Sequence, residues 1–160
     1  MRIDGSCHCG RIRFEAEVDP GKVLICHCTD CQTLSGSAFR VVVASEPGSF
    51  RLLAGTPRIY AKTAASGNVR DLAFCGDCGT PIYSGPPDAP AASRVLGLRV
   101  GAIRQRDLLV PRDQYWFRSS RPWLADLQAL SHWDTQPAFG ADGSFANTSG
   151  ESLPASKNEL

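Results

Sequence analysis

Polar and apolar residues alternate over several short stretches of this chain, and most of these stretches end at a glycine or a proline. In residues 11–18, Ile12, Phe14, Ala16 and Val18 fall on one side of an extended backbone. A period of two is typical of a half-buried β-strand. The same pattern, or a short apolar run, predicts further strands over residues 22–26, 38–44, 50–53, 58–61, 69–74, 80–84 and 94–100. Turn signals such as Asp19-Pro20-Gly21 separate them, so we expect a mainly β, antiparallel architecture.

Helical periodicity is weak by comparison. No amphipathic helix is expected before residue 100, and the one candidate is residues 122–130, where a proline suits the first turn and three leucines are spaced by three. The small, polar C-terminal sequence predicts a disordered tail over residues 136–160. Residues 1–135 are expected to form one domain, since 160 residues provide one core but hardly two.

The composition is that of an ordinary globular protein, with a net charge of +1 and 42% hydrophobic residues. This balance gives no reason to expect a polyanionic partner. The first residues lack an apolar signal region, and no apolar run is long enough to span a bilayer. We therefore expect a cytoplasmic protein whose thiols stay reduced.

Cysteines supply the strongest chemical signal. Seven of them form three clusters: Cys7-x-Cys9, Cys26-x-Cys28-x-x-Cys31 and Cys75-x-x-Cys78. An odd number cannot pair completely into disulfides, and such clustering in a reducing compartment indicates metal ligation. Zinc suits these ligands best. The alternatives are redox thiols or an iron–sulfur centre, although no fourth cysteine follows the central cluster closely.

The seven ligands divide naturally into four and three. A closed structural zinc takes four ligands, which the first and last clusters supply together by joining distant parts of the chain. The central trio then leaves one tetrahedral position free for an incoming ligand. The alternative is that His8, His27 or His132 completes a shell and every metal is purely structural. His27 lies between two ligands, so we expect it to point away from the metal, toward a supporting or surface position.

Three thiolates on Zn²⁺ sum to a formal charge of about −1. Such an ion is a weak Lewis acid that can still bind and deprotonate a thiol. The hypothesis that follows is chemistry at a carbon–sulfur bond. Ser35-Gly36-Ser37, just after the trio, is either a turn or a hydrogen-bonding contact for substrate, and Asp30 is expected to form a turn.

A basic and aromatic region lies later in the chain. Residues 94–121 contain seven arginines against two aspartates, with Tyr115, Trp116 and Phe117 among them. Three interpretations stand: a solvated face, a site for a substrate carboxylate, or a nucleic-acid surface. The near-zero net charge argues against nucleic acid, because phosphate contacts dominate that affinity.

The three cysteine clusters together resemble the glutathione-dependent formaldehyde-activating (GFA) family, which includes the centromere protein V group. The resemblance rests on the motifs at residues 5–10, 26–31 and 74–80, and it extends to the aromatic region near Trp123. It implies an antiparallel Mss4-like β fold with a short helical or irregular C-terminal segment. It also implies two Zn²⁺ ions per chain: a structural one on Cys7, Cys9, Cys75 and Cys78, and a catalytic one on Cys26, Cys28 and Cys31.

The resemblance further implies carbon–sulfur lyase activity of the S-(hydroxymethyl)glutathione synthase type. The expected partner is a small-molecule thiol such as glutathione, or a thiol adduct. The alternative from another functional class is a non-catalytic zinc-binding module that binds an anionic partner or nucleic acid.

Overall fold

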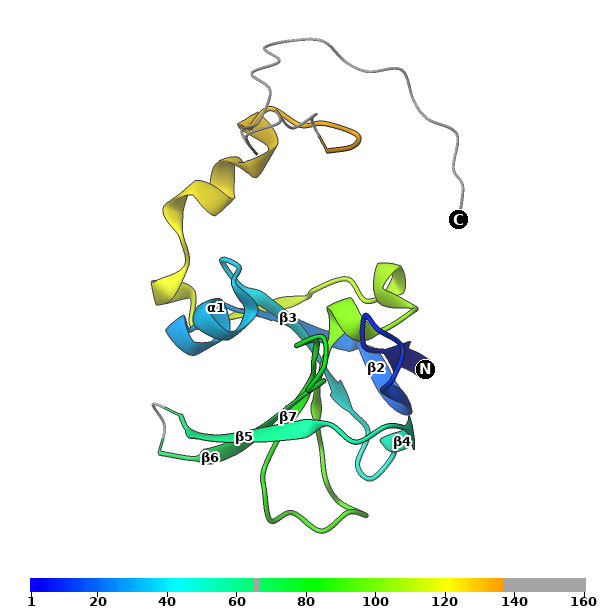
Figure 1. Cartoon of the computed structure of the whole chain (residues 1–160). Coiled ribbons are helices and arrows are strands. Elements are labelled where there is room, and N and C mark those ends of the chain that lie inside the picture. Colours follow the sequence, from blue (N-terminus) through cyan, green and yellow to red (C-terminus); the bar gives the residue numbers. More distant parts are fainter. Residues whose placement is uncertain (65–66, 137–160) are drawn as a thin grey trace. The chain divides into compact units, whose positions relative to one another are not determined.

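The computed structural model describes residues 1–64 and 67–136 and divides into two compact units, Met1–Arg121 and Pro122–Leu160 (Figure 1). The regular secondary structure of the first unit is mostly strand: β1 (Arg2–Ser6), β2 (Arg13–Cys26), β3 (Arg40–Ser45), β4 (Arg51–Ala54), β5 (Arg58–Thr63), β6 (Val69–Phe74), β7 (Pro81–Gly85), β8 (Gly97–Arg99) and β9 (Asp113–Tyr115). Its helices are short: α1 (Thr29–Ser35) and the 3₁₀ turns η1 (Val100–Ala102), η2 (Arg106–Leu108) and η3 (Phe117–Ser119). The predicted mainly β, antiparallel fold is confirmed.

The strands follow the order β1-β2-β3-β8-β7-β6-β5, and β4 and β9 also pair with β2. All of these pairings are antiparallel except that of β9 with β2. The alternating residues Ile12, Phe14, Ala16 and Val18 are all buried, as their pattern predicts.

Strand β2 is continuous where the sequence predicts a turn. The prediction of a turn at Asp19-Pro20-Gly21 is wrong. The backbone stays extended there, and the register of β2 against β3 shifts between Val18 and Val23. Such an irregularity lets Val18 and Val23 both stay buried and accommodates Pro20, which has no N–H for the ladder. One half of β2 therefore pairs with β1 and β4, and the other half carries Cys26 alongside β3 and β9.

Helix α1 corrects the expectation that no helix precedes residue 100. It has seven residues, too few for an amphipathic period to show in the sequence. Its ends are capped locally: Cys28 Sγ accepts a hydrogen bond from the Cys31 N–H at 3.3 Å, and Gly36 takes the left-handed conformation with φ 63°. Ser35 Oγ donates to the Cys31 carbonyl at 2.6 Å, so this serine helps to end the helix.

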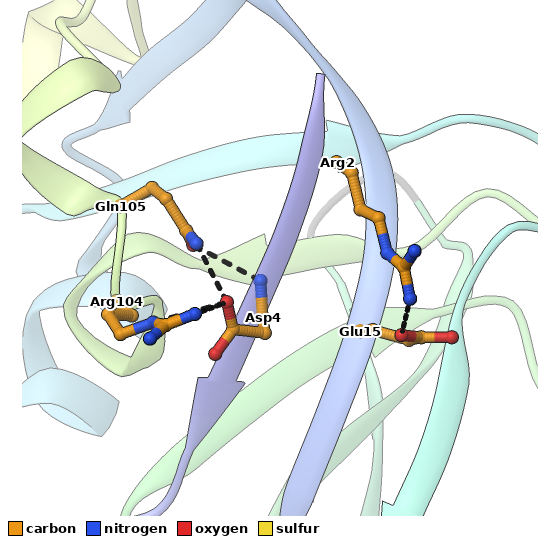
Figure 2. A network of polar contacts seen from close by, with 5 residues as sticks. All are labelled: Arg2, Asp4, Glu15, Arg104 and Gln105. Atoms are coloured by element: carbon orange, nitrogen blue, oxygen red, sulfur yellow. Dashed lines mark hydrogen bonds and ion pairs between the residues drawn. The ribbon is translucent and has the colours of Figure 1, made fainter.

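A polar network fastens β1 to its neighbours (Figure 2). Asp4 Oδ1 accepts hydrogen bonds from Arg104 Nη2 at 2.6 Å and from Gln105 Nε2 at 2.7 Å, while Arg2 Nη2 donates to Glu15 Oε2 on β2 at 2.6 Å. The hydrogen bonds from Gln105 and then Arg104 hold the pKa of Asp4 below its ordinary value.

The second unit is described over residues 122–136. The predicted helix at 122–130 is found as η4 (Pro122–Ala129), a 3₁₀ helix interrupted at Asp126, where φ is −111°. A leucine every third residue suits a 3₁₀ helix, which has three residues per turn. The expected tail over 136–160 lies outside the described residues from 137 onward. Within the described ranges, no helix combines the length and apolarity needed to cross a membrane.

Candidate metal centres

The four cysteines of the first and third sequence motifs lie together in one cluster. The sulfur atoms of Cys7, Cys9, Cys75 and Cys78 all lie within 4.8 Å of one another. Two of the separations are 3.5 Å, from Cys7 to Cys9, and 3.8 Å, from Cys9 to Cys75. Zn–S bonds of about 2.3 Å in a tetrahedron place the sulfurs about 3.8 Å apart, so this cluster has the dimensions of a four-sulfur zinc site.

The chain positions these cysteines with tight turns at strand ends. Cys7 follows β1 and Cys75 follows β6, and both are buried. The Ile12 N–H donates to Cys7 Sγ at 3.2 Å, and Cys78 Sγ lies 3.2 Å from Thr80 Oγ1. This contact with Thr80 is the main cause that lowers the pKa of Cys78 to about 5. Hydrogen bonds of this kind favour the thiolate form, which is the form that binds metal.

The central trio forms a second, separate cluster. Cys26 is the last residue of β2, Cys28 caps α1 and Cys31 lies in its first turn. Their sulfur atoms also lie within 4.8 Å of one another. A hydrogen bond from Cys31 is the main cause that lowers the pKa of Cys26 to about 5, and the same contact raises the pKa of Cys31. Three convergent cysteine sulfurs suit a soft metal such as zinc, so each of the two clusters could hold a metal ion.

Gln32 anchors the helix that carries the trio. This buried residue of α1 donates from Nε2 to the His27 carbonyl at 2.6 Å and to the Ser119 carbonyl at 2.9 Å. Its Oε1 accepts from Arg121 Nε at 2.9 Å. All hydrogen-bonding groups of this amide point to fixed partners, which orients α1 and therefore Cys31. Gln32 could not be predicted from the sequence, because two of its partners, Ser119 and Arg121, lie far along the chain.

No histidine among the described residues joins either sulfur cluster. His27 points away from the trio as expected, but the surface alternative is wrong: the residue is 1% exposed. Its Nε2 hydrogen-bonds Gln114 Oε1 at 2.8 Å, and its ring contacts Phe39 and Phe117 edge-on. His8 is exposed next to the four-cysteine cluster, and His132 lies in the second unit. These contacts of the buried His27 ring therefore hold the backbone in place between Cys26 and Cys28.

The three-cysteine cluster lines a cavity of about 970 Å³. Five basic side chains share this lining: Arg40, Lys62, Arg70, Arg99 and Arg118. The one acidic residue in the lining is Asp30, which forms an ion pair with Lys62 and does not merely shape a turn. The cavity is therefore strongly basic, although the whole chain is almost neutral.

Strand register explains this lining. Cys26 on β2 lies opposite Arg40 on β3, and Val42 on β3 lies opposite Arg99 on β8. Partners across an antiparallel pair, and residues two apart in a strand, point to the same face of a sheet. Cys26, Arg40 and Arg99 therefore share one face. On the outer strands, Lys62 of β5 lies directly opposite Arg70 of β6.

Arg40 and Arg99 are buried within this wall, at 7% and 8% exposure. Burial, and after it the positive charge of Arg40, lower the pKa of Arg99 to about 10. Arg40 was not predicted as a site residue, although a signal was present: it is the one charged residue in a segment, residues 38–44, that is predicted to be a core strand. The register that brings Lys62 and Arg70 to the same cavity could not be inferred from the sequence.

The arginines of residues 94–121 do not act as one surface. Arg94 Nη2 donates to the Ala89 carbonyl at 2.7 Å, Arg104 pairs with Asp4, and Arg118 stacks over the Trp116 ring at 4.9 Å. Only Arg99 and Arg118 of this group line the cavity. Of the arginines in residues 94–121, only Arg99 and Arg118 are therefore candidates for binding a substrate carboxylate in this cavity.

Comparisons with known proteins agree with this architecture. A solved structure of a Rhodobacter sphaeroides protein superposes with a TM-score of 0.52 at 19% sequence identity, over 69% of this chain and 98% of that one. At this identity the likeness concerns the fold alone. No match is found among curated proteins. The family model described as "Glutathione-dependent formaldehyde-activating enzyme" matches residues 2–119, which include both cysteine clusters. The chain belongs to the glutathione-dependent formaldehyde-activating (GFA) family.

Proposed function

We propose that this protein is a zinc-dependent enzyme of the carbon–sulfur lyase type that acts on a thiol adduct, as in S-(hydroxymethyl)glutathione synthesis. Family membership supports a glutathione-related activity. The observation that carries the proposal is the unequal pair of clusters: within the described residues one offers four sulfurs and the other three, and the three line a large cavity.

In this proposal Cys7, Cys9, Cys75 and Cys78 hold a structural zinc, and Cys26, Cys28 and Cys31 hold the reactive one. With zinc bound, Cys26, Cys28 and Cys31 would leave one position open for a substrate sulfur, and the ion would favour the deprotonated form of that sulfur. Cys26, Cys28 and Cys31 would thus fix where the substrate sulfur is bound, at the wall of the cavity. The basic residues around them would attract an anionic substrate and hold it there.

The reaction itself is a simple addition and its reverse. In the synthetic direction the thiol sulfur adds to the aldehyde carbon and forms the C–S bond. The electron pair of the C=O double bond moves to oxygen, which takes up the proton that the thiol lost. In the lyase direction the same C–S bond breaks and the aldehyde and the thiol are restored.

The test measures sulfur coordination and thiol binding together. X-ray absorption at the zinc edge should give an average of about 3.5 sulfurs per zinc, from four on one ion and three on the other, and about 4 after glutathione is added. Cys28→Ser should abolish glutathione binding in calorimetry and acceleration of adduct formation in ¹³C NMR. Two ions with four protein ligands each, and no thiol binding, would contradict the proposal and support the non-catalytic binding module.

A further inference from the structure

An apolar cavity of about 440 Å³ adjoins the larger cavity that the cysteine trio lines. The two cavities share four lining residues: Leu34, Arg40, Leu72 and Arg99. Arg40 and Arg99 are the charged residues of the apolar cavity, and its other lining residues are leucine, alanine, proline, glycine, phenylalanine and tyrosine. The space beside the trio therefore has a basic part and an apolar part.

Strand register and helix α1 together form the lining of the apolar cavity. Tyr60 on β5 lies opposite Leu72 on β6, and Phe74 follows Leu72 by two positions, so these three side chains share one face of the sheet. Leu34 follows Cys31 by three positions in α1, and residues at this spacing lie on the same side of a helix. Leu34 therefore connects the apolar lining to the helix that carries Cys31.

Part of this apolar surface is left for a ligand to cover. Leu34 is 38% exposed and Tyr60 is 53% exposed, although both line the cavity. Apolar surface in a concave site is typical of small-molecule binding sites. Formaldehyde does not account for it: one carbon and one oxygen occupy little more space than a water molecule, about 30 Å³, and would leave most of the 440 Å³ unfilled.

The reaction under the proposed function leaves room for a larger carbonyl compound. In an adduct R–CH(OH)–S, the carbon bonded to sulfur also bears the substituent R, which is hydrogen when the aldehyde is formaldehyde. When the C–S bond breaks, its electron pair stays on sulfur, the O–H electron pair forms the second C–O bond, and the released proton goes to sulfur. R takes no part in these steps, so its size is free to vary. Because the two cavities share a wall, a sulfur held at the trio places R beside the apolar cavity.

We propose that the apolar cavity binds the substituent R of the adduct, and that the substrate is therefore an adduct of a larger, apolar aldehyde, such as hexanal, and not of formaldehyde. The inference rests on the proposed function for the sulfur end of the substrate. The cavity itself requires only its apolar lining. Its ligand is recognised by burial of apolar surface, to which each fully buried methylene group contributes about fourfold in affinity.

The test compares two stable thioethers that differ only in an apolar chain. S-Hexylglutathione and S-methylglutathione share the whole glutathione part, and neither carries the hydroxyl group that cleavage requires. Calorimetry on the zinc-loaded protein should show that the hexyl compound binds at least about tenfold more tightly than the methyl compound. Tyr60→Ser removes part of the apolar lining and should reduce this ratio at least about threefold.

Ile59→Ser is the matched control. Ile59 precedes Tyr60 on β5 and is similarly exposed, at 48%, but successive side chains of a strand point to opposite faces, and of the two only Tyr60 lines the apolar cavity. Ile59→Ser should therefore leave the affinity ratio unchanged. Equal affinities for the two thioethers, or the same loss of the hexyl preference in both variants, would overturn the inference.

Turnover provides a direct comparison of the two aldehydes. Measured by ¹³C NMR, the acceleration of adduct formation with glutathione over the uncatalysed rate should be greater for hexanal than for formaldehyde. A greater acceleration for formaldehyde would overturn the inference.

A further measurement depends on no variant and on no sulfur compound. In the unmodified protein, 1-hexanol should produce saturable shifts of the methyl resonances of Leu34 and Leu72, while those of Leu108, which is 64% exposed in η2, should not move. Hexanol that leaves Leu34 and Leu72 unmoved would overturn the inference, and this result is decisive even if a variant fails to fold. Hexanol binding without any binding of glutathione or its thioethers would reject the proposed function and keep the apolar site.

Discussion

The ammonium group of Lys62, on β5, forms an ion pair with the carboxylate of Asp30, in the first turn of α1. The two residues are 32 positions apart in the chain, and both line the cavity that holds the cysteine trio. The Lys62 side chain is only 16% exposed, whereas Asp30 is 45% exposed. The pair therefore fastens the outer strand of the sheet to the helix that positions Cys31.

Removing either partner of this pair should have unequal effects. Asp30→Asn leaves a mostly buried ammonium without its anion and removes an acidic group from the first turn of a helix, so it should cost about 1–2 kcal/mol of unfolding free energy. Lys62→Met keeps the apolar stem packed and leaves a half-exposed carboxylate, so it should cost less than about 1 kcal/mol. Urea unfolding measures both, and a larger loss for Lys62→Met would show that the ion pair does not have this structural role.

Gly5 is the position in β1 where any side chain should be harmful. A Cβ at this residue would lie 2.3 Å from both the Ala102 carbonyl oxygen and Phe14 Cζ. Phe14 is fully buried and the carbonyl belongs to the backbone, so neither can move away easily. Gly5→Ala should therefore destabilise the protein by about 2–3 kcal/mol.

Gly101→Ala is the matched control for this prediction. A Cβ at Gly101 would have nothing within 4 Å and requires no unusual φ, so thermal unfolding should change little. If Gly5→Ala unfolded at the same temperature as Gly101→Ala, close packing of β1 against Phe14 and Ala102 would be contradicted.

The sequence predicts the strands well because their alternation is local, and it predicts the grouping of the sulfurs because the number of ligands limits how they divide. The alternation of polar and apolar residues through Phe14 and Val18 is the pattern expected of a half-buried strand. The four-plus-three grouping of sulfurs, expected from ligand counting and from the family resemblance, corresponds to the two clusters found. The predictions that zinc fills them and that one ion is catalytic await the measurements above.

What the sequence does not predict depends on register or on very short elements. Asp19-Pro20-Gly21 has the composition of a turn, yet pairing on both sides keeps β2 extended through it. Helix α1 is too short to show a hydrophobic period, and its cap is a cysteine thiol and not a usual capping residue. Arg40 and Arg99 lie on the same face of the sheet because β2, β3 and β8 pair in a particular register. A single sequence does not specify this register.

The two sulfur clusters should differ sharply in their contribution to stability. The four-cysteine cluster joins residues as far apart as Cys9 and Cys75, 66 positions along the chain. The trio spans only six residues and closes no long loop. Cys78→Ser should therefore cost at least about 3 kcal/mol and one zinc per chain, since metal binding across a long loop stabilises the folded state.

Cys28→Ser is the companion variant and should behave differently. It should also lose zinc, but serine is a good helix-capping residue, so α1 should keep its N-terminal cap and the loss of stability should stay near about 1 kcal/mol. Zinc analysis and thermal unfolding of the two variants, side by side, provide the comparison. Equal destabilisation would mean that the trio, too, has a major structural role.

The network around Asp4 predicts a definite pH dependence. Its pKa is lowered in the folded protein, mainly by hydrogen bonds from Gln105 and Arg104, so its ionised form stabilises the fold above the unfolded pKa of about 3.9. This contribution should be lost only as the pH falls through the folded pKa. Because the Asp4 side chain is 42% exposed, Asp4→Asn should cost only about 0.5–1 kcal/mol of unfolding free energy at pH 7.

Urea unfolding measures this cost, with Asp107→Asn as a control at an exposed position. The difference in unfolding free energy between the unmodified protein and Asp4→Asn should stay constant between pH 7 and about pH 5. A difference that shrank over this interval would mean that the Asp4 pKa is raised on folding, which the hydrogen bonds from Gln105 and Arg104 do not permit.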